Sequence, residues 1–319
     1  ARDYTVKVDA TGLKPATEYT FLFRAKAADG DVISPSGRTR TTSADGTAPV
    51  KLGVVSCSNY QFGLFTAYTE LSKEAGLDAI VHLGDYLYEY GTDGYGGDVA
   101  EKLGRPHDPP TEIISLSDYR RRHAQYKTDP GSQAMHAAHT FMACWDDHES
   151  ANNPWTGGAQ NHQPDREGDW AARREASIRA YFEWMPVREP EWLDRPDATR
   201  AQFWRSYSFG DLATLATLET RHTARAEQID YAPVMAQTGD AEAIAQFRRD
   251  VLGGVRPACQ CRRAAGDGER AQRLAGARGP DAPRDRGRGV AARHQPHVGD
   301  LQRRRSRRQP DPAARHAPG

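Results

Sequence analysis

The residues best suited to chemistry in this sequence stand close together between Asp146 and Asn153. Two aspartates, a histidine, a glutamate and two asparagines lie there, with only a serine and an alanine among them. Such a polar cluster is costly to desolvate unless a cation holds it. The apolar run 140–145 before it predicts a buried strand, and open α/β sheets place their sites at the carboxyl ends of strands. The pattern indicates a metal site, and a polar loop in which Asp146 or Asp147 caps a helix is the alternative.

Two further strand-like runs end in residues of the same kind. Residues 77–83 lead into a loop that carries Asp85 and Tyr88, and residues 51–55 lead to Cys57. Thiolate, carboxylate and phenolate ligands together suit a hard, charged metal such as ferric iron better than zinc alone. The alternatives are a turn aspartate, a packing tyrosine and a small buried cysteine, respectively.

Alternating strands and helices are predicted to position these side chains within residues 46–254. Apolar runs and helical periodicity predict strands near 51–55, 79–83 and 140–145, helices near 65–76, 116–126 and 170–185, and a hairpin of strands 203–209 and 212–219. The Gly-, Pro- and Asp-rich stretch 91–112 is predicted to be a long loop. This order indicates layers of α/β structure with mixed sheets.

Residues 1–45 are predicted to form antiparallel β structure. Tyr4, Val6 and Val8 alternate with polar residues, and a turn at 29–30 precedes a last strand near 38–41. A β-sandwich needs about seven strands, and this segment supplies three or four. We therefore expect further strands, and any export signal, to precede this chain.

The motifs at the three strand ends resemble those of the metallophosphoesterases. Gly84-Asp85-x-x-Tyr88 and Asp146-Asp147-His148-Glu149, with Ser56-Cys57-Ser58 before them, are similar to the motifs of PhoD-type alkaline phosphatases. The resemblance covers most of residues 1–254. It implies α/β metallophosphoesterase-like layered sheets, cut short after residue 254. The last strands of a fibronectin type III-like or Ig-like β-sandwich would precede them at residues 1–45.

The resemblance also implies roles for the metal ligands. Asp85 would bridge two metal ions, Cys57 and Tyr88 would bind the first, and Asp147 would bind the second. His148 would contact the phosphate and act as a general acid.

Supporting roles are implied for four more residues. Glu149 would orient the histidine beside it, and Asn152 and Asn153 are candidates to support the ligands or form only a turn. Arg221 would hold the substrate phosphate through a bidentate contact, or form a surface ion pair.

The implied activity is metal-dependent hydrolysis of phosphate mono- or diesters, including lipid or sugar phosphates, with iron and calcium as the metals. A monomer in a secreted, periplasmic or cell-surface location is expected, without a specific nucleic-acid partner. The resemblance also implies later strands that carry histidines and a further aspartate to complete the site. No strand is predicted after Asp250 to carry them, because His294 and His297 lie among proline and arginine residues. We therefore expect impaired activity in this chain.

The formal net charge of zero hides a division near residue 255. Residues 255–319 contain 16 arginines against 6 acidic residues, and no Phe, Trp or Tyr. One explanation is a disordered basic tail, which would suit a non-catalytic protein that binds nucleic acid or anionic surfaces. The other is translation of a GC-rich gene out of frame from about residues 252–255 onward.

The sequence supports neither a membrane-spanning helix nor a framework of disulfide bonds. No apolar run approaches the roughly 18 residues that a membrane helix needs. Four cysteines in 319 residues do not indicate a disulfide framework, and Cys144 is predicted to be a core residue.

Overall fold

A three-stranded parallel sheet forms the centre of the molecule. The structure is a computed structural model that describes residues 2–189, 204–223, 225–228 and 245–246. The sheet has the order β5–β6–β7, with β5 at Leu52–Val55, β6 at Ala79–His82 and β7 at Phe141–Ala143. The central strand β6 is buried along its whole length because layers cover both of its faces. The predictions of these three strands are confirmed.

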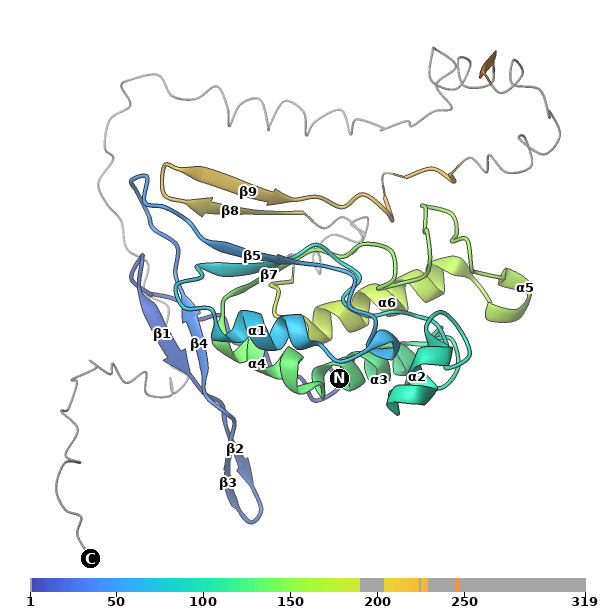
Figure 1. Ribbon diagram of the computed structural model, residues 1–319, viewed down its shortest axis with the longest axis horizontal. Coiled ribbons are helices and arrows are strands. Elements are labelled where there is room, and N and C mark those ends of the chain that lie inside the picture. The colour runs from blue at the N-terminus through green and yellow to red at the C-terminus, as the bar shows by residue number, and fades with distance from the viewer. Residues whose placement is uncertain (1, 190–203, 224, 229–244, 247–319) are drawn as a thin grey trace, which may run out of the picture.

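Helices cover one face of this sheet (Figure 1). They include α1 (Thr66–Lys73), α3 (Leu116–Lys127), α4 (Pro130–Ala138) and α6 (Trp170–Trp184). Ile80 packs with residues of α1 and α4, while an aromatic core with Tyr86 and Trp145 joins α3 to α6. Helix α4 was not predicted, although Asp129 accepts hydrogen bonds at its amino end and Pro130 opens its first turn.

A β-hairpin covers part of the opposite face. Strands β8 (Arg205–Phe209) and β9 (Ala213–Thr217) are antiparallel, as predicted, and Phe209 packs on Val81 and Met142. Gly210 is required at the turn because a Cβ there would lie 2.4 Å from a backbone oxygen of Gly46. The hairpin (ochre in Figure 1) does not cover the end of β5, where Val54 is 60% exposed.

The segment predicted as a long loop at 91–112 contains a helix. Helix α2 (Gly97–Leu103) lies between Gly96 and Gly104, which both have left-handed backbone angles. Two short helices, η1 (Tyr60–Phe62) and α5 (Pro164–Glu167), are also present. The loop prediction was wrong because glycines that delimit a short helix have the same composition as a loop.

The amino-terminal segment forms two small sheets. Strand β1 (Glu18–Phe21) pairs with β4 (Gly37–Arg40), and β2 (Arg24–Ala27) pairs with β3 (Gly30–Ile33), all antiparallel. The strand expected at Tyr4–Val8 is wrong, since those residues are irregular and exposed. Alternation alone does not make a strand without a partner to accept its backbone hydrogen bonds.

Two remaining expectations concern membranes and the basic tail. Across the part of the chain that the structure describes, every helix is too short or too polar to span a bilayer. The tail at 255–319 lies outside the described residues.

Candidate metal centre

The loops that follow β5, β6 and β7 meet at the carboxyl edge of the sheet. The backbone N–H of Cys57 donates to the Gly84 carbonyl at 3.2 Å, which fixes the first loop on the second. A Cβ at Gly84 would lie 2.2 Å from the backbone nitrogen of Asp146, so only glycine allows the second and third loops to approach. The parallel strands thus gather the residues predicted to bind metal.

The Asp85 carboxylate lies at the middle of this group. Its Oδ2 accepts hydrogen bonds from Cys57 Sγ at 3.4 Å and from the Tyr88 hydroxyl at 3.3 Å. Its Oδ1 accepts the backbone N–H of His148 at 3.3 Å. Asp85, Asp147 and His148 also offer ligand atoms that all lie within 4.8 Å of one another.

These separations fit a metal site. Ligand atoms about 2.0–2.3 Å from a shared ion are about 3–3.5 Å apart, which matches the spacing around Asp85 Oδ2. Burial raises the pKa of the Cys57 thiol, and burial together with Asp85 raises that of the Tyr88 hydroxyl. Both groups hold their protons without a metal, so metal binding at this position must release protons.

A backbone conformation that most residues avoid shapes the loops. Cys57, Asp85 and Asn153 have φ angles of +58°, +53° and +48°, in the left-handed region. Each conformation turns the chain sharply after a strand or within the third loop. The site therefore depends on local strain that the surrounding contacts must offset.

Glu89 is the partner of His148. Its Oε2 lies 2.7 Å from His148 Nδ1, and its other oxygen accepts the backbone N–H of Asn152 at 2.6 Å. The Glu89 side chain is 0% exposed. Burial opposes the charged imidazole, but Glu89, with Asp147 and Asp85, raises the pKa of His148 to about 9.

Glu149, which was predicted to orient His148, makes its hydrogen bonds to other residues. Its carboxylate accepts the backbone N–H groups of Tyr86 at 2.7 Å and Asp146 at 2.8 Å. Glu149 therefore joins the second loop to the third. The sequence signal for Glu89 is its position directly after Tyr88, but the sequence prediction gave this role to Glu149.

Arg221 lies in ion pairs with the carboxylates of the third loop. Its Nε donates to Asp146 Oδ1 at 2.7 Å and its Nη2 to Asp147 Oδ1 at 3.2 Å. Burial raises the pKa of Asp147, but His148, the Asn153 N–H and Arg221 outweigh it and leave that pKa lowered. Of the two predicted roles for Arg221, the structure thus contains the ion pair.

The two asparagines contribute to this site through their backbone. The Asn152 and Asn153 side chains both donate to Gln160 Oε1, at 3.0 and 2.7 Å. The backbone N–H of Asn153 donates to Asp147 Oδ2 at 2.9 Å. The two side chains therefore hold the loop through Gln160, and the Asn153 backbone holds the Asp147 carboxylate.

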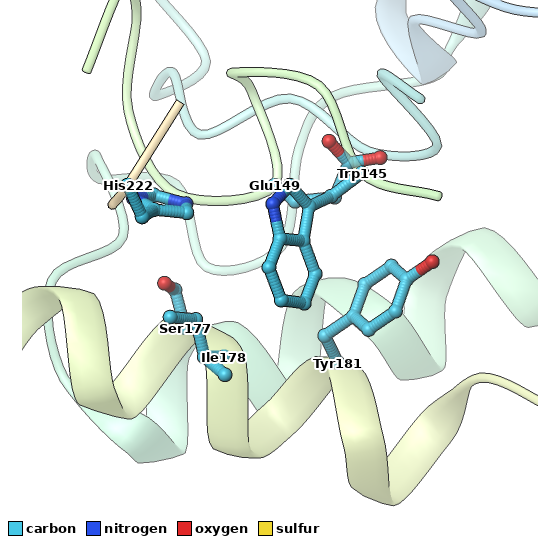
Figure 2. Close-up of a pocket in the computed structure, with 6 residues that line it drawn as sticks. All are labelled: Trp145, Glu149, Ser177, Ile178, Tyr181 and His222. Carbon is cyan, nitrogen blue, oxygen red and sulfur yellow. The ribbon is translucent and has the colours of Figure 1, made fainter. Parts of the chain in front are cut away.

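A packed layer lies beneath the third loop. Trp145 stands between His222 and Tyr181 above α6 (Figure 2), with ring centroids 5.8 and 5.3 Å away. The small cavity lined by these rings, Glu149, Ser177 and Ile178 has no room for a water molecule. This layer supports the loop and offers no ligand site.

Comparisons with known proteins agree with this geometry. Residues 52–256 match the family model of the PhoD-like phosphatases, and residues 1–43 match that of their N-terminal domain. The chain is 39% identical over 225 residues to alkaline phosphatase D of Bacillus subtilis (strain 168), covering 68% of this chain and 36% of the relative. A solved structure of PhoD matches at a TM-score of 0.59 and 36% identity, over 68% of this chain and 40% of that one. The chain thus spans well under half of these relatives, and it belongs to the PhoD-like phosphatase family.

Proposed function

We propose that this chain takes part in the metal-dependent hydrolysis of phosphate esters. The observation that carries the proposal is the position of the Asp85 carboxylate. One oxygen faces the Cys57 thiol and the Tyr88 hydroxyl, and the other faces the loop of Asp147 and His148. A carboxylate with ligands on both sides suits a bridge between two metal ions, as in two-metal phosphoesterases.

Four residues would hold the metals. Asp85 would bridge the two ions, with Cys57 and Tyr88 on the first and Asp147 on the second. When bound, the metal ions polarise the phosphoryl group as Lewis acids. The thiol and phenol beside Asp85 favour Fe³⁺ and the oxygen ligands near Asp147 suit Ca²⁺, so we propose this pair.

His148 would deliver the proton that the leaving alcohol needs. Glu89 occupies Nδ1, so Nε2 is the nitrogen available to the substrate. The hydrogen bond to Glu89 favours the protonated imidazole. The Nε2–H would pass its proton to the ester oxygen as the P–O bond breaks.

Arg221 would bind the phosphate once metal is present. Its guanidinium is now held by Asp146 and Asp147. A cation on Asp147 would weaken that attraction and leave guanidinium N–H groups for the phosphoryl oxygens.

The substrate would be a phosphate mono- or diester, with lipid and sugar phosphates included. The relative named alkaline phosphatase D supports this class. By the same likeness we propose a monomer that works outside the cytoplasm, in a secreted, periplasmic or cell-surface location.

We also propose the domain division made from the sequence. Residues 1–45 would belong to a fibronectin type III-like domain and 46–254 to the phosphatase domain.

The family match ends at residue 256, where the arginine-rich composition begins, which supports out-of-frame translation of 255–319. Sequencing the gene across codons 245–260 tests this, since an intact reading frame would contradict it.

Metal binding by the purified chain is the decisive experiment. We expect the wild-type chain to bind Fe³⁺ and Ca²⁺, measured by calorimetry and by elemental analysis after gel filtration. Asp85→Asn keeps the shape of the side chain but removes its charge, so we expect loss of both metals. Hydrolysis of p-nitrophenyl phosphate and of bis-p-nitrophenyl phosphate is measured on the same samples.

Two variants make the result specific. Asp165→Asn changes an exposed carboxylate in α5 and should leave metal binding unchanged. His148→Asn should keep the metals and lower any hydrolysis by about 10²–10⁴-fold. Equal metal binding by wild type and Asp85→Asn would overturn the proposal.

A further inference from the structure

Two exposed aromatic side chains lie beside the candidate metal centre. Phe62 is 43% exposed and Tyr95 is 59% exposed, and their rings meet edge to face at 4.7 Å. Large apolar surface left in contact with water is unfavourable, so a paired exposed patch calls for an explanation. We call Phe62 and Tyr95 the aromatic shelf.

The backbone under the aromatic shelf is firmly held. The carbonyl of Tyr95 accepts the side-chain amide of Asn59 at 3.2 Å and that of Gln61 at 3.4 Å. Gln61 is fully buried and also bonds to the backbone of Gly91 and of His107. The shelf therefore stands on fixed supports in η1 and the segment before α2.

A row of rings connects the shelf to His148. The Tyr95 ring lies 6.0 Å from Tyr90 and 6.4 Å from Tyr88. Tyr88 stacks on the His148 imidazole at 4.2 Å, and Tyr90 lies 5.5 Å from it. A substrate whose phosphoryl group reaches His148 would extend its alcohol portion along these rings.

We propose that the aromatic shelf binds a planar aromatic group, such as a nucleobase, in the alcohol portion of the phosphate ester. The inference rests on the proposed function, since it presumes that the phosphoryl group binds near Asp85 and His148. Phe62 and Tyr95 offer neutral ring surfaces, which hold planar groups by stacking and select little among them. The shelf thus selects for an aromatic alcohol and against a small aliphatic one.

Matched ligands and variants test the inference. The chain is loaded with Fe³⁺ and Ca²⁺, freed of unbound metal, and titrated with orthophosphate, ribose 5-phosphate and adenosine 5′-monophosphate. The last two differ only in the base, so we expect the nucleotide to bind about 5- to 100-fold more tightly. Phosphate release is assayed in the same samples, so that hydrolysis is not mistaken for weak binding.

Tyr95→Ala and Phe62→Ala should each reduce this ratio, while orthophosphate affinity stays the same. Tyr95→Phe keeps the ring and should keep the ratio. Both positions are exposed, and circular dichroism checks that the variants fold. An unchanged ratio in both alanine variants, or equal binding of the two esters to wild type, would overturn the inference alone. Absence of binding for all three ligands would overturn the proposed function as well.

Discussion

Glu89 determines how His148 is oriented and charged. The carboxylate is fully buried and receives N–H groups from the His148 ring, the Asn152 backbone and the Asn161 side chain. These donors and the short contact with the imidazole hold the Glu89–His148 pair in one geometry. The His148 side chain thus has one nitrogen committed to the protein and one left for chemistry.

Replacing Glu89 by Gln should lower the pKa of His148. A charge-assisted hydrogen bond contributes about 1.5–3 kcal/mol, so the pKa should fall by about 1–2. NMR titration of the metal-free protein measures it directly. Glu149→Gln is the matched control, since Glu149 bonds to backbone N–H groups and should move this pKa less. A larger fall in Glu149→Gln would contradict the assignment of Glu89.

The raised pKa of His148 also predicts how stability changes with pH. Its folded pKa of about 9 exceeds the 6.5 of an unperturbed histidine, so the charged ring stabilises the folded metal-free protein. This contribution, on the order of 3 kcal/mol, is complete below pH 6.5 and is lost as pH rises through 9. The unfolding free energies of wild type and His148→Asn, measured with urea, should therefore converge between pH 6.5 and pH 9. A stability difference that grows with pH would refute this.

The sequence was sufficient to predict which candidate ligands lie together, but not which residues hydrogen-bond to them. Cys57, Asp85 and Asp147 follow apolar runs, and parallel strands place their carboxyl ends together whatever the loops do. Glu89 and Glu149 are both acidic residues beside a motif, and the path of each loop decides which one reaches His148. That path depends on left-handed backbone angles, which the residue types do not reveal.

At the scale of elements, α2 and α4 are joined through a buried ion pair. Asp129 accepts the N–H groups of Gly131 and Ser132 at the start of α4, and its Oδ2 accepts Arg105 Nη2 at 2.9 Å. The Arg105 guanidinium lies 3.6 Å above the Tyr60 ring. One carboxylate thus begins a helix and fixes the segment that follows α2.

Asp129→Ala should be among the more damaging changes outside the metal centre. It removes a cap and leaves Arg105 buried without its partner, so we expect a loss of about 3–5 kcal/mol in unfolding free energy. Ser115→Ala at the exposed capping box of α3 should cost only about 1 kcal/mol. Chemical denaturation compares them, and equal losses would show that the ion pair contributes nothing.

The elements that escaped prediction share a physical cause. Helix α2 lies between glycines, and α4 contains proline, glycine and small residues, so neither shows a strong apolar stripe. The alternation at Tyr4–Val8 predicted a strand, yet strands form only where a neighbour pairs with them. The short strands of the central sheet and α6 were predictable because they contain apolar residues that face a core.

At the scale of the whole molecule, the described residues cover only part of one face of the sheet. Side chains alternate along a strand, so Val54 and Leu52 point to the same side as Val81, the registered neighbour of Val54. The hairpin packs on Leu52 and Val81 but leaves Val54 in contact with water.

An exposed apolar surface on this face should be measurable. We expect the chain to bind the dye ANS, and Val54→Thr should weaken that binding while changing the unfolding free energy by less than about 0.5 kcal/mol. Val81→Thr places the same hydroxyl in the buried part of the face and should lower the unfolding free energy by about 1–3 kcal/mol. Equal destabilisation by the two changes would mean that Val54 is covered in solution.

At the left-handed residues of the candidate metal centre, the side chain that the proposed chemistry needs differs from the one that would make the fold most stable. At Cys57 and Asp85, glycine would relieve the backbone strain but remove a proposed ligand. A laboratory selection for heat resistance alone would therefore favour glycine at these positions, at the expense of the proposed metal binding. Retaining cysteine and aspartate there requires selection for activity in every generation.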